Sequence, residues 1–252
     1  FSYKESHETS LSEWQNIERN HPGAWADFES DRYMMQVPTS WIYNFDNPQS
    51  LMQNWDRGSD AVSEMLGRPD LRTKTPTYTQ IDVIFRGSAY FPGYPMSNYP
   101  YSPNDVTDGN KDHPLLKGSD HIGSIHWHEH GHQENITKFP GETEALVNFL
   151  YIAVMNKNFD MDLDTAFNTS FTPTLNIYMD DAAEMRVITE TFRQGNPRNI
   201  SNQPGDEVKY QHRGYAHYVD IVDLFGWCAV EDFWYSESVD YMNGIIYDTN
   251  NP

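Results

Sequence analysis

The chain has little cysteine, little positive charge and no long apolar run. Its one cysteine, Cys228, cannot form an internal disulfide, so a disulfide-stabilised scaffold is excluded. Seventeen basic residues stand against 37 acidic ones, and the formal net charge of -20 argues against nucleic acid, whose binders place Lys and Arg on phosphates. The same deficit argues against docking on an anionic membrane. A mean hydropathy of -0.73 predicts no membrane span.

Aromatic residues are plentiful, and their share of 14% excludes a disordered chain. The length of 252 residues suffices for a sizeable core in one large domain or two small ones. The chain begins at Phe1 without a signal-peptide pattern, which suggests a processed or excised domain flanked by others. The acidic composition fits an extracellular or saline setting, and equally a charge that only maintains solubility. Sequons at Asn135, Asn168 and Asn199 carry little weight, because such triplets are common by chance.

The first half of the chain carries mostly strand signals. Residues 1–23 are polar and predict a lead-in segment or a short helix. Alternation over Tyr33–Val37 predicts the one strand expected before residue 41, and residues 81–85 predict another. The Pro- and Tyr-rich segment 87–100, with its centre near 88–97, predicts an edge strand, because proline is tolerated at a sheet edge and not in a central strand.

Helical spacing dominates the second half. One earlier helix is expected to begin at Asp46-Asn47-Pro48, with an apolar stripe that runs to Leu66. Further helices are predicted over about 124–136, 143–157, 180–193 and 213–235. The pattern predicts an α+β fold with a mixed β-sheet N-terminal lobe over 1–123 and a mostly helical lobe over 124–252.

Four histidines alternate along the stretch from His126 to His132. On an α-helix, residues four apart lie about 40° apart around the axis and about 6 Å apart along it. Two pairs could therefore share one metal ion: His126 with His130, and His128 with His132. The plainer interpretation is a solvated helix face that is rich in histidine.

A glutamate distinguishes the two pairs. Only His128 is followed directly by a glutamate, Glu129, which completes the pattern H-E-x-x-H. On a helix this glutamate would lie beside a metal-bound water, whereas in the other register Trp127, which cannot accept a proton, would take that place. The pattern predicts His128 and His132 as zinc ligands and Glu129 as the general base.

A catalytic zinc site needs a third protein ligand and one open position. Glu134 lies about 200° from His132 on the same helix and cannot reach the ion. Pro140-Gly141 permits a chain reversal, so a second helix can run beside the first. Of Glu142 and Glu144 on that helix, Glu144 is preferred because it shares a polar edge with Asn148.

These residues resemble a known family. The pattern H-E-x-G-H followed by Glu144-x-x-x-Asn148 is similar to the enhancin-like zinc metallopeptidases, gluzincins that include bacterial mucin-degrading proteases. The resemblance spans about residues 22–235. It also includes Pro22–Glu29, Val37–Ser40, Asn47–Asp56, Phe91–Met96, Gly123–His132 and Leu224–Trp227. One departure is His132-Gln133-Glu134-Asn135, where family members often carry His-Asn-x-Gln.

The resemblance implies a single zincin-like metallopeptidase catalytic domain over residues 1–252, with its active-site cleft between the two lobes. It implies one Zn²⁺ on His128, His132 and Glu144, with Glu129 as the base. It also implies a secreted or cell-surface enzyme that acts on O-glycosylated proteins such as mucins.

Several other residues are candidates for the same chemistry. Asn148 is expected to hydrogen-bond the cleft wall or a ligand. Tyr94 and the backbone of residues 90–97 are candidates for binding an extended substrate by strand addition, and an ordinary proline-capped sheet edge accounts for them equally well. Tyr215, His217 and Tyr218 are candidate oxyanion donors, although aromatic packing and surface polarity are the favoured interpretation for each of them taken singly.

Three functions compete. The first is a secreted zinc endopeptidase directed at glycoproteins, and the second is a glycan- or glycoprotein-binding module without turnover. An intact Glu129 favours the first. The third, a structural zinc domain, is disfavoured because such sites are filled with Cys and His.

Trp127 and Cys228 are expected to be buried.

Overall fold

The computed structural model describes residues 1–67, 76–82, 84, 92–98, 112–134, 143–170 and 216–244. The chain forms two compact units. Unit 1 comprises Phe1–Ser63 and Pro69–Gly123, and unit 2 comprises Glu64–Arg68 and Ser124–Pro252. The division after Gly123 therefore has one exception, because the end of the first long helix packs with unit 2.

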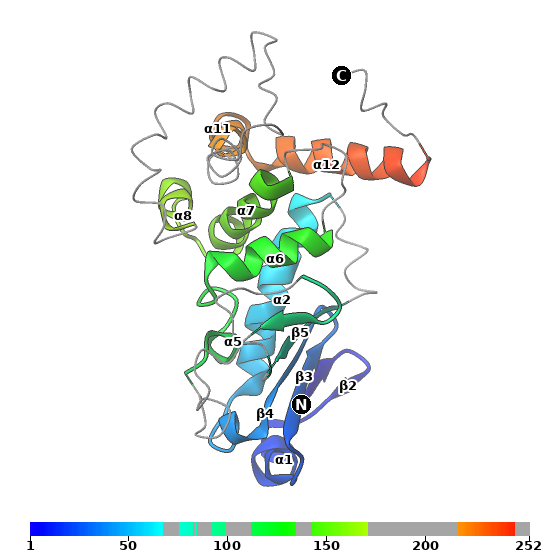
Figure 1. The fold of residues 1–252 in the computed structure, drawn as a ribbon, viewed down its shortest axis with the longest axis vertical. Coiled ribbons are helices and arrows are strands. Elements are labelled where there is room, and N and C mark those ends of the chain that lie inside the picture. Colours follow the sequence, from blue (N-terminus) through cyan, green and yellow to red (C-terminus); the bar gives the residue numbers. More distant parts are fainter. Residues whose placement is uncertain are drawn as a thin grey trace. The chain divides into compact units, whose positions relative to one another are not determined.

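Unit 1 contains a mixed six-stranded sheet in the order β2-β1-β3-β4-β5-β6 (Figure 1). The pairs β1–β2 and β3–β4 are antiparallel, and the other neighbours are parallel. The strands are β1 Ser2–Lys4, β2 His7–Glu8, β3 Trp25–Ser30, β4 Tyr33–Pro38, β5 Thr77–Ile81 and β6 Met96–Asn98. Among the described residues β6 lies at the edge of the sheet, which confirms the edge strand predicted from the Pro-rich segment over Met96–Asn98; residues 87–91 and 99–100 lie outside the described residues.

Among its described residues, unit 1 has one long helix, α2 Pro48–Met65, whose last two residues belong to unit 2. The shorter ones are α1 Leu11–Asn16, the 3₁₀ turns Glu18–Asn20 and Thr39–Trp41, and α5 Pro114–Lys117. The apolar stripe of α2 packs on the sheet: the Trp55 indole stacks on Tyr33 of β4 with ring centroids 4.1 Å apart. Its indole N–H donates to the carbonyl of Leu115 at 3.0 Å. Trp55 thus ties the sheet, α2 and α5 together.

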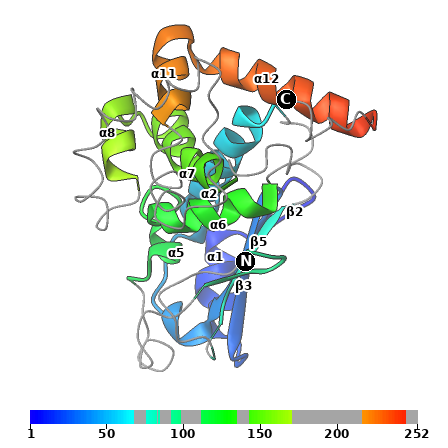
Figure 2. The same ribbon diagram turned by 45° about the horizontal axis from the view of Figure 1, so that its top comes forward.

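Unit 2 consists of helices in its described part (Figure 2). They are α6 Ser124–Glu134, α7 Thr143–Ala153 with a π-helical turn over Val154–Asn158, α8 Leu163–Thr169, α11 Ala216–Phe225 and α12 Trp227–Met242. Lys157 in the π turn forms ion pairs with Glu64, at 3.2 Å, and with Glu231 of α12. No helix in the described ranges is both long and apolar enough to cross a membrane.

Three expectations about elements were wrong and one was incomplete. The short helix expected within residues 1–23 is α1, but the β1–β2 hairpin precedes it. Two strands, β3 and β4, lie where one strand was expected before residue 41. The strand expected over 81–85 lies earlier, because Asp82 ends β5 by accepting a hydrogen bond from the Ile84 N–H at 2.9 Å. The helix expected over 213–235 is broken at Gly226, whose φ of 78° is left-handed.

Trp127 is fully buried, as expected. Cys228 is exposed, so the expectation of a buried thiol was wrong. It is the second residue of α12, directly after the break at Gly226, where the chain turns on the surface. The helix predicted over 180–193 lies outside the described residues.

Candidate metal centre

Helix α6 carries the histidine-rich stretch. Its residues run from Ser124 to Glu134 without proline, which confirms the predicted helix over 124–134; residues 135–136 lie outside the described residues. His126, His128 and His130 are buried, whereas His132 and Glu129 are half-buried.

His128 and His132 direct the same ring nitrogen toward each other. Their Nε2 atoms lie 3.2 Å apart, and the two rings are nearly perpendicular, with centroids 4.8 Å apart. A tetrahedral zinc ion with bonds of about 2.0–2.1 Å holds two ligand atoms about 3.3 Å apart. The two nitrogens are therefore spaced as two zinc ligands would be.

Asn148 of α7 controls the protonation of His128. The Nδ1 atom of His128 lies 2.6 Å from the Oδ1 atom of Asn148, in a buried contact between residues 20 positions apart. An amide oxygen only accepts hydrogen bonds, so Nδ1 of His128 carries the proton and donates it. In the neutral ring the lone pair is then on Nε2, the atom that faces His132. The contact prepares His128 to bind a metal through Nε2.

Glu129 lies close to both histidines. The ligand atoms of His128, Glu129 and His132 all lie within 4.8 Å of one another, and within the described parts of the chain no other His, Cys, Asp or Glu group meets this condition. Carboxylate and imidazole groups at this spacing suit a divalent cation and a proton acceptor beside it.

Gly131 allows α6 and α7 to approach. A Cβ atom at this position would lie 2.6 Å from the Cβ of Val147 on α7, closer than such atoms approach in proteins. Val147 directly precedes Asn148, so the glycine brings α7 near enough for Asn148 to reach His128. Gly131, the second x of the H-E-x-x-H pattern, is thus the position at which α6 and α7 pack closely.

The alternative pair has other neighbours. The His126 ring packs edge-on against Trp127, and the Trp127 ring lies 5.2 Å from that of His130. Nε2 of His130 lies 3.9 Å from a carboxylate oxygen of Glu134. These contacts place both rings in the packing around Trp127.

For most of the other predicted site residues, the structure does not describe the side chain. Glu144 lies on α7, four residues or one helical turn before Asn148. The side chains of Glu144 and His217 lie outside the described residues, as do Glu142 and Tyr215 altogether. Tyr218 on α11 is buried, with its ring centroid 5.6 Å from that of Phe149 on α7. This contact agrees with the aromatic packing that was the alternative interpretation of Tyr218. Its role as an oxyanion donor stays a prediction.

Tyr94 precedes β6 in unit 1, and its side chain is 63% exposed. Its ring contacts Tyr78 edge-on, with centroids 5.8 Å apart. Strand addition beside Tyr94 stays a prediction.

The chain has relatives among known proteins. The family model described as "Peptidase M60, enhancin and enhancin-like" matches residues 3–238. The TRPM8 channel-associated factor homolog of Xenopus laevis is 28% identical over 149 residues, and the human TRPM8 channel-associated factor 1 is 26% identical over 148 residues. Each match covers 58% of this chain and 16% of the relative, so this chain spans about a sixth of their length.

Solved structures of similar architecture come from Clostridium perfringens. The M60 catalytic domain of ZmpC in complex with the sialyl T antigen covers 91% of this chain and 52% of its own, at 9% identity and a TM-score of 0.40. The M60 catalytic domain of ZmpB with two CBM51 domains covers 92% of this chain and 29% of its own, at 12% identity and a TM-score of 0.39.

Proposed function

Because the chain belongs to the peptidase M60 family of enhancin and enhancin-like proteins, we propose that it is a zinc-dependent endopeptidase that cleaves O-glycosylated, mucin-like proteins. The observation that carries the proposal is the convergence of His128, Glu129 and His132 on α6. The glycoprotein substrate follows from the resemblance to mucin-degrading gluzincins. A secreted or cell-surface location is part of the proposal and follows from the same resemblance.

In this proposal three residues hold the zinc: His128 and His132 through Nε2, and Glu144 from α7. The bound ion would polarise the scissile carbonyl and lower the pKa of its water toward about 7. Asn148 keeps the proton of His128 on Nδ1, so that the lone pair of the ring is on Nε2. The proposed role of Glu144 as a zinc ligand is tested by Glu144→Ala, which should weaken zinc binding. Glu134→Ala on α6 is its control and should not.

The carboxylate of Glu129 performs the proton transfers. It takes a proton from the attacking water and then gives this proton to the nitrogen of the departing amine, so that one proton moves and the carboxylate is restored. Its half-buried position beside the two histidines suits this role, because water can reach the carboxylate there.

A single set of incubations tests the proposal. The protein is mixed with a mucin-type glycoprotein and, separately, with unglycosylated casein, each with and without a metal chelator. Cleavage of the glycoprotein that is lost with the chelator and in Glu129→Gln supports the proposal. Cleavage that persists in either condition contradicts it. Equal cleavage of casein would contradict the glycoprotein preference alone.

The second candidate is a binding module that keeps the fold without turnover. The observation that favours it is the naming of the vertebrate relatives for association with the TRPM8 channel, which is a binding role. If this candidate holds, the protein takes up zinc and retains the glycoprotein on a column, yet cleaves neither substrate. The intact Glu129 beside the histidine pair favours the peptidase.

A further inference from the structure

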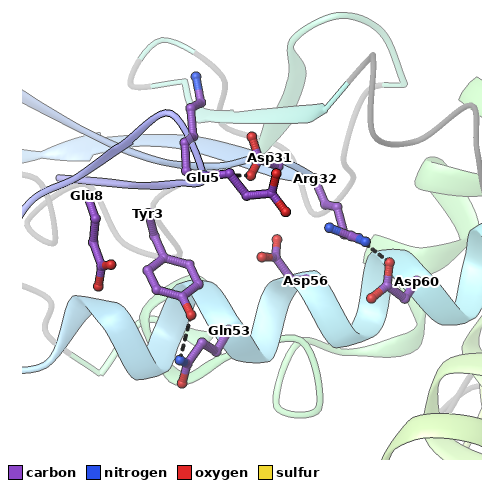
Figure 3. A pocket seen from close by; sticks show the side chains of 9 residues that line it. Tyr3, Glu5, Glu8, Asp31, Arg32, Gln53, Asp56 and Asp60 are labelled. Atoms are coloured by element: carbon purple, nitrogen blue, oxygen red, sulfur yellow. Dashed lines mark hydrogen bonds and ion pairs between the residues drawn. The ribbon is translucent and has the colours of Figure 1, made fainter.

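Unit 1 has a cavity of about 430 Å³ whose lining includes no residue of the candidate metal centre. Its walls come from three segments: the β1–β2 hairpin, the turn between β3 and β4, and the middle of α2 (Figure 3). The volume falls in the range of about 300–1,000 Å³ that is usual for small-ligand pockets. Polar and charged side chains form its whole lining.

The two basic residues of the lining are already neutralised. Arg32 in the β3–β4 turn forms an ion pair with Asp60 of α2 (Figure 3). Nζ of Lys4 lies 2.5 Å from a carboxylate oxygen of Glu29, which is not part of the lining. The remaining carboxylates of the lining are those of Glu5, Glu8, Asp31 and Asp56, and none of them has an ion pair within the described part of the chain. Arg32 also attracts Asp56 and Asp31, but the lining contains five carboxylates and two basic side chains, so it keeps an excess of negative charge.

Asp56 is the most costly of these carboxylates to keep ionised. It projects from α2 toward the segments that carry Glu5 and Asp31 (Figure 3), and it accepts a hydrogen bond from the Ser30 hydroxyl. Burial raises its pKa to about 6, although the hydrogen bond from Ser30 and the attraction of Arg32 lower it, and repulsion from Asp60 and Asp31 adds a smaller increase. A cation placed in the cavity would offset both penalties.

The arrangement suits a ligand with several donors better than a single ion. Among the described residues, only the α6 group has ligand atoms that converge within 4.8 Å, so the carboxylates of this cavity do not surround one point. A guanidinium or a chain of ammonium groups distributes its N–H donors over several ångströms. The Tyr3 ring beside the cavity, fixed by a 2.8 Å hydrogen bond from Gln53 to its hydroxyl, offers an aromatic face to such a cation (Figure 3).

We propose that this cavity of unit 1 binds an organic cation, a guanidinium or an alkylammonium group, between Asp56 of α2 and the carboxylates of the β1–β2 hairpin. The source of the cation is either a basic side chain of a polypeptide or a free polyamine. The site is separate from the zinc proposal, because every residue of its lining belongs to unit 1 and the histidines belong to unit 2.

Calorimetric titration of the whole chain at pH 7.5 tests the site. The probes are N-acetyl-arginine amide, its uncharged isostere N-acetyl-citrulline amide, spermidine, and calcium chloride. We expect the arginine probe to bind at least tenfold more tightly than the citrulline probe, and calcium to bind no more tightly than citrulline. Tighter binding of spermidine than of arginine would assign the site to free polyamines, and the reverse would assign it to basic side chains.

Matched variants localise the binding. Asp56→Asn and Glu5→Gln should each weaken the preferred cation at least tenfold, and Glu5 is exposed, so its replacement leaves the fold intact. Asp223→Asn removes the same charge from an exposed position on α11 and should leave the affinity unchanged. Equal binding of arginine and citrulline, failure of both cations to bind, or an unchanged affinity in Glu5→Gln overturns the proposal.

Discussion

Asn148 holds His128 from a neighbouring helix: the Oδ1 atom of Asn148 lies 2.6 Å from Nδ1 of His128, while Nε2 of His128 lies 3.2 Å from Nε2 of His132. The two contacts assign opposite roles to the two nitrogens of one ring. Nδ1 donates to the amide, and Nε2 presents its lone pair to the second histidine. Through these two contacts, Asn148 of α7 orients a histidine of the candidate metal centre on α6.

Removal of the Asn148 amide should weaken metal binding. In Asn148→Ala the His128 ring loses the acceptor that orients it, and zinc affinity should fall by about 10- to 100-fold. Asn148→Asp retains an acceptor oxygen and should keep most of the affinity. Zinc dissociation constants measured by competition with a chromogenic chelator check both variants. Equal affinity in wild type and Asn148→Ala would contradict the positioning role.

Replacement of the proposed base should separate binding from turnover. Glu129→Gln should lower kcat/KM on a mucin-type substrate by about 10²- to 10⁴-fold, because an amide cannot take the proton of water. Zinc content should stay at the wild-type level, since the two histidines remain. Glu134→Gln, on the same helix and outside the three-residue group, is the control and should retain activity. A comparable loss in the control would show that the effect is not specific to Glu129.

A methyl group at Gly131 should force α6 and α7 apart. In Gly131→Ala the new Cβ would lie 2.6 Å from Cβ of Val147, so the helices must separate, and the free energy of unfolding should fall by about 1–3 kcal/mol. Gly123→Ala is the control, because a Cβ there meets nothing within 4 Å. Denaturant unfolding measures both. The same variant should bind zinc more weakly, since separation of the helices withdraws Asn148 from His128.

The pH dependence of stability should reveal Asp56. Its pKa is raised from an ordinary 3.8 to about 6, so the folded state binds the proton more tightly than the unfolded state. The stabilisation from this proton is complete below about pH 4 and is lost as the pH rises through about 6. Asp56→Asn should therefore be more stable than wild type at pH 7.5 and equal to it near pH 4.

The shift corresponds to at most about 3 kcal/mol, and solvent screening of this half-exposed carboxyl lowers the expected difference to about 1–2 kcal/mol. Thermal unfolding of both proteins from pH 4 to 8 measures it, with Asp223→Asn as the control for lost surface charge. A difference that does not change with pH would contradict the assignment to Asp56.

The sequence by itself determined the parts of the protein that depend on local spacing. His128 and His132 are one helical turn apart, so their convergence follows from helix geometry once residues 124–134 are helical. The edge position of β6 follows in the same way from the prolines around it, which cannot donate to a neighbouring strand.

Tertiary structure alone decided the features that join distant segments. No spacing rule places Asn148 on His128, because their contact depends on how closely Gly131 lets α7 approach α6. The cavity of unit 1 is lined by the β1–β2 hairpin, the β3–β4 turn, and α2, which lies about 50 residues after the hairpin. The polar residues at the N-terminus did not predict this hairpin. Such contacts come from long-range packing, in which each residue's environment is set by segments whose positions the local sequence does not encode.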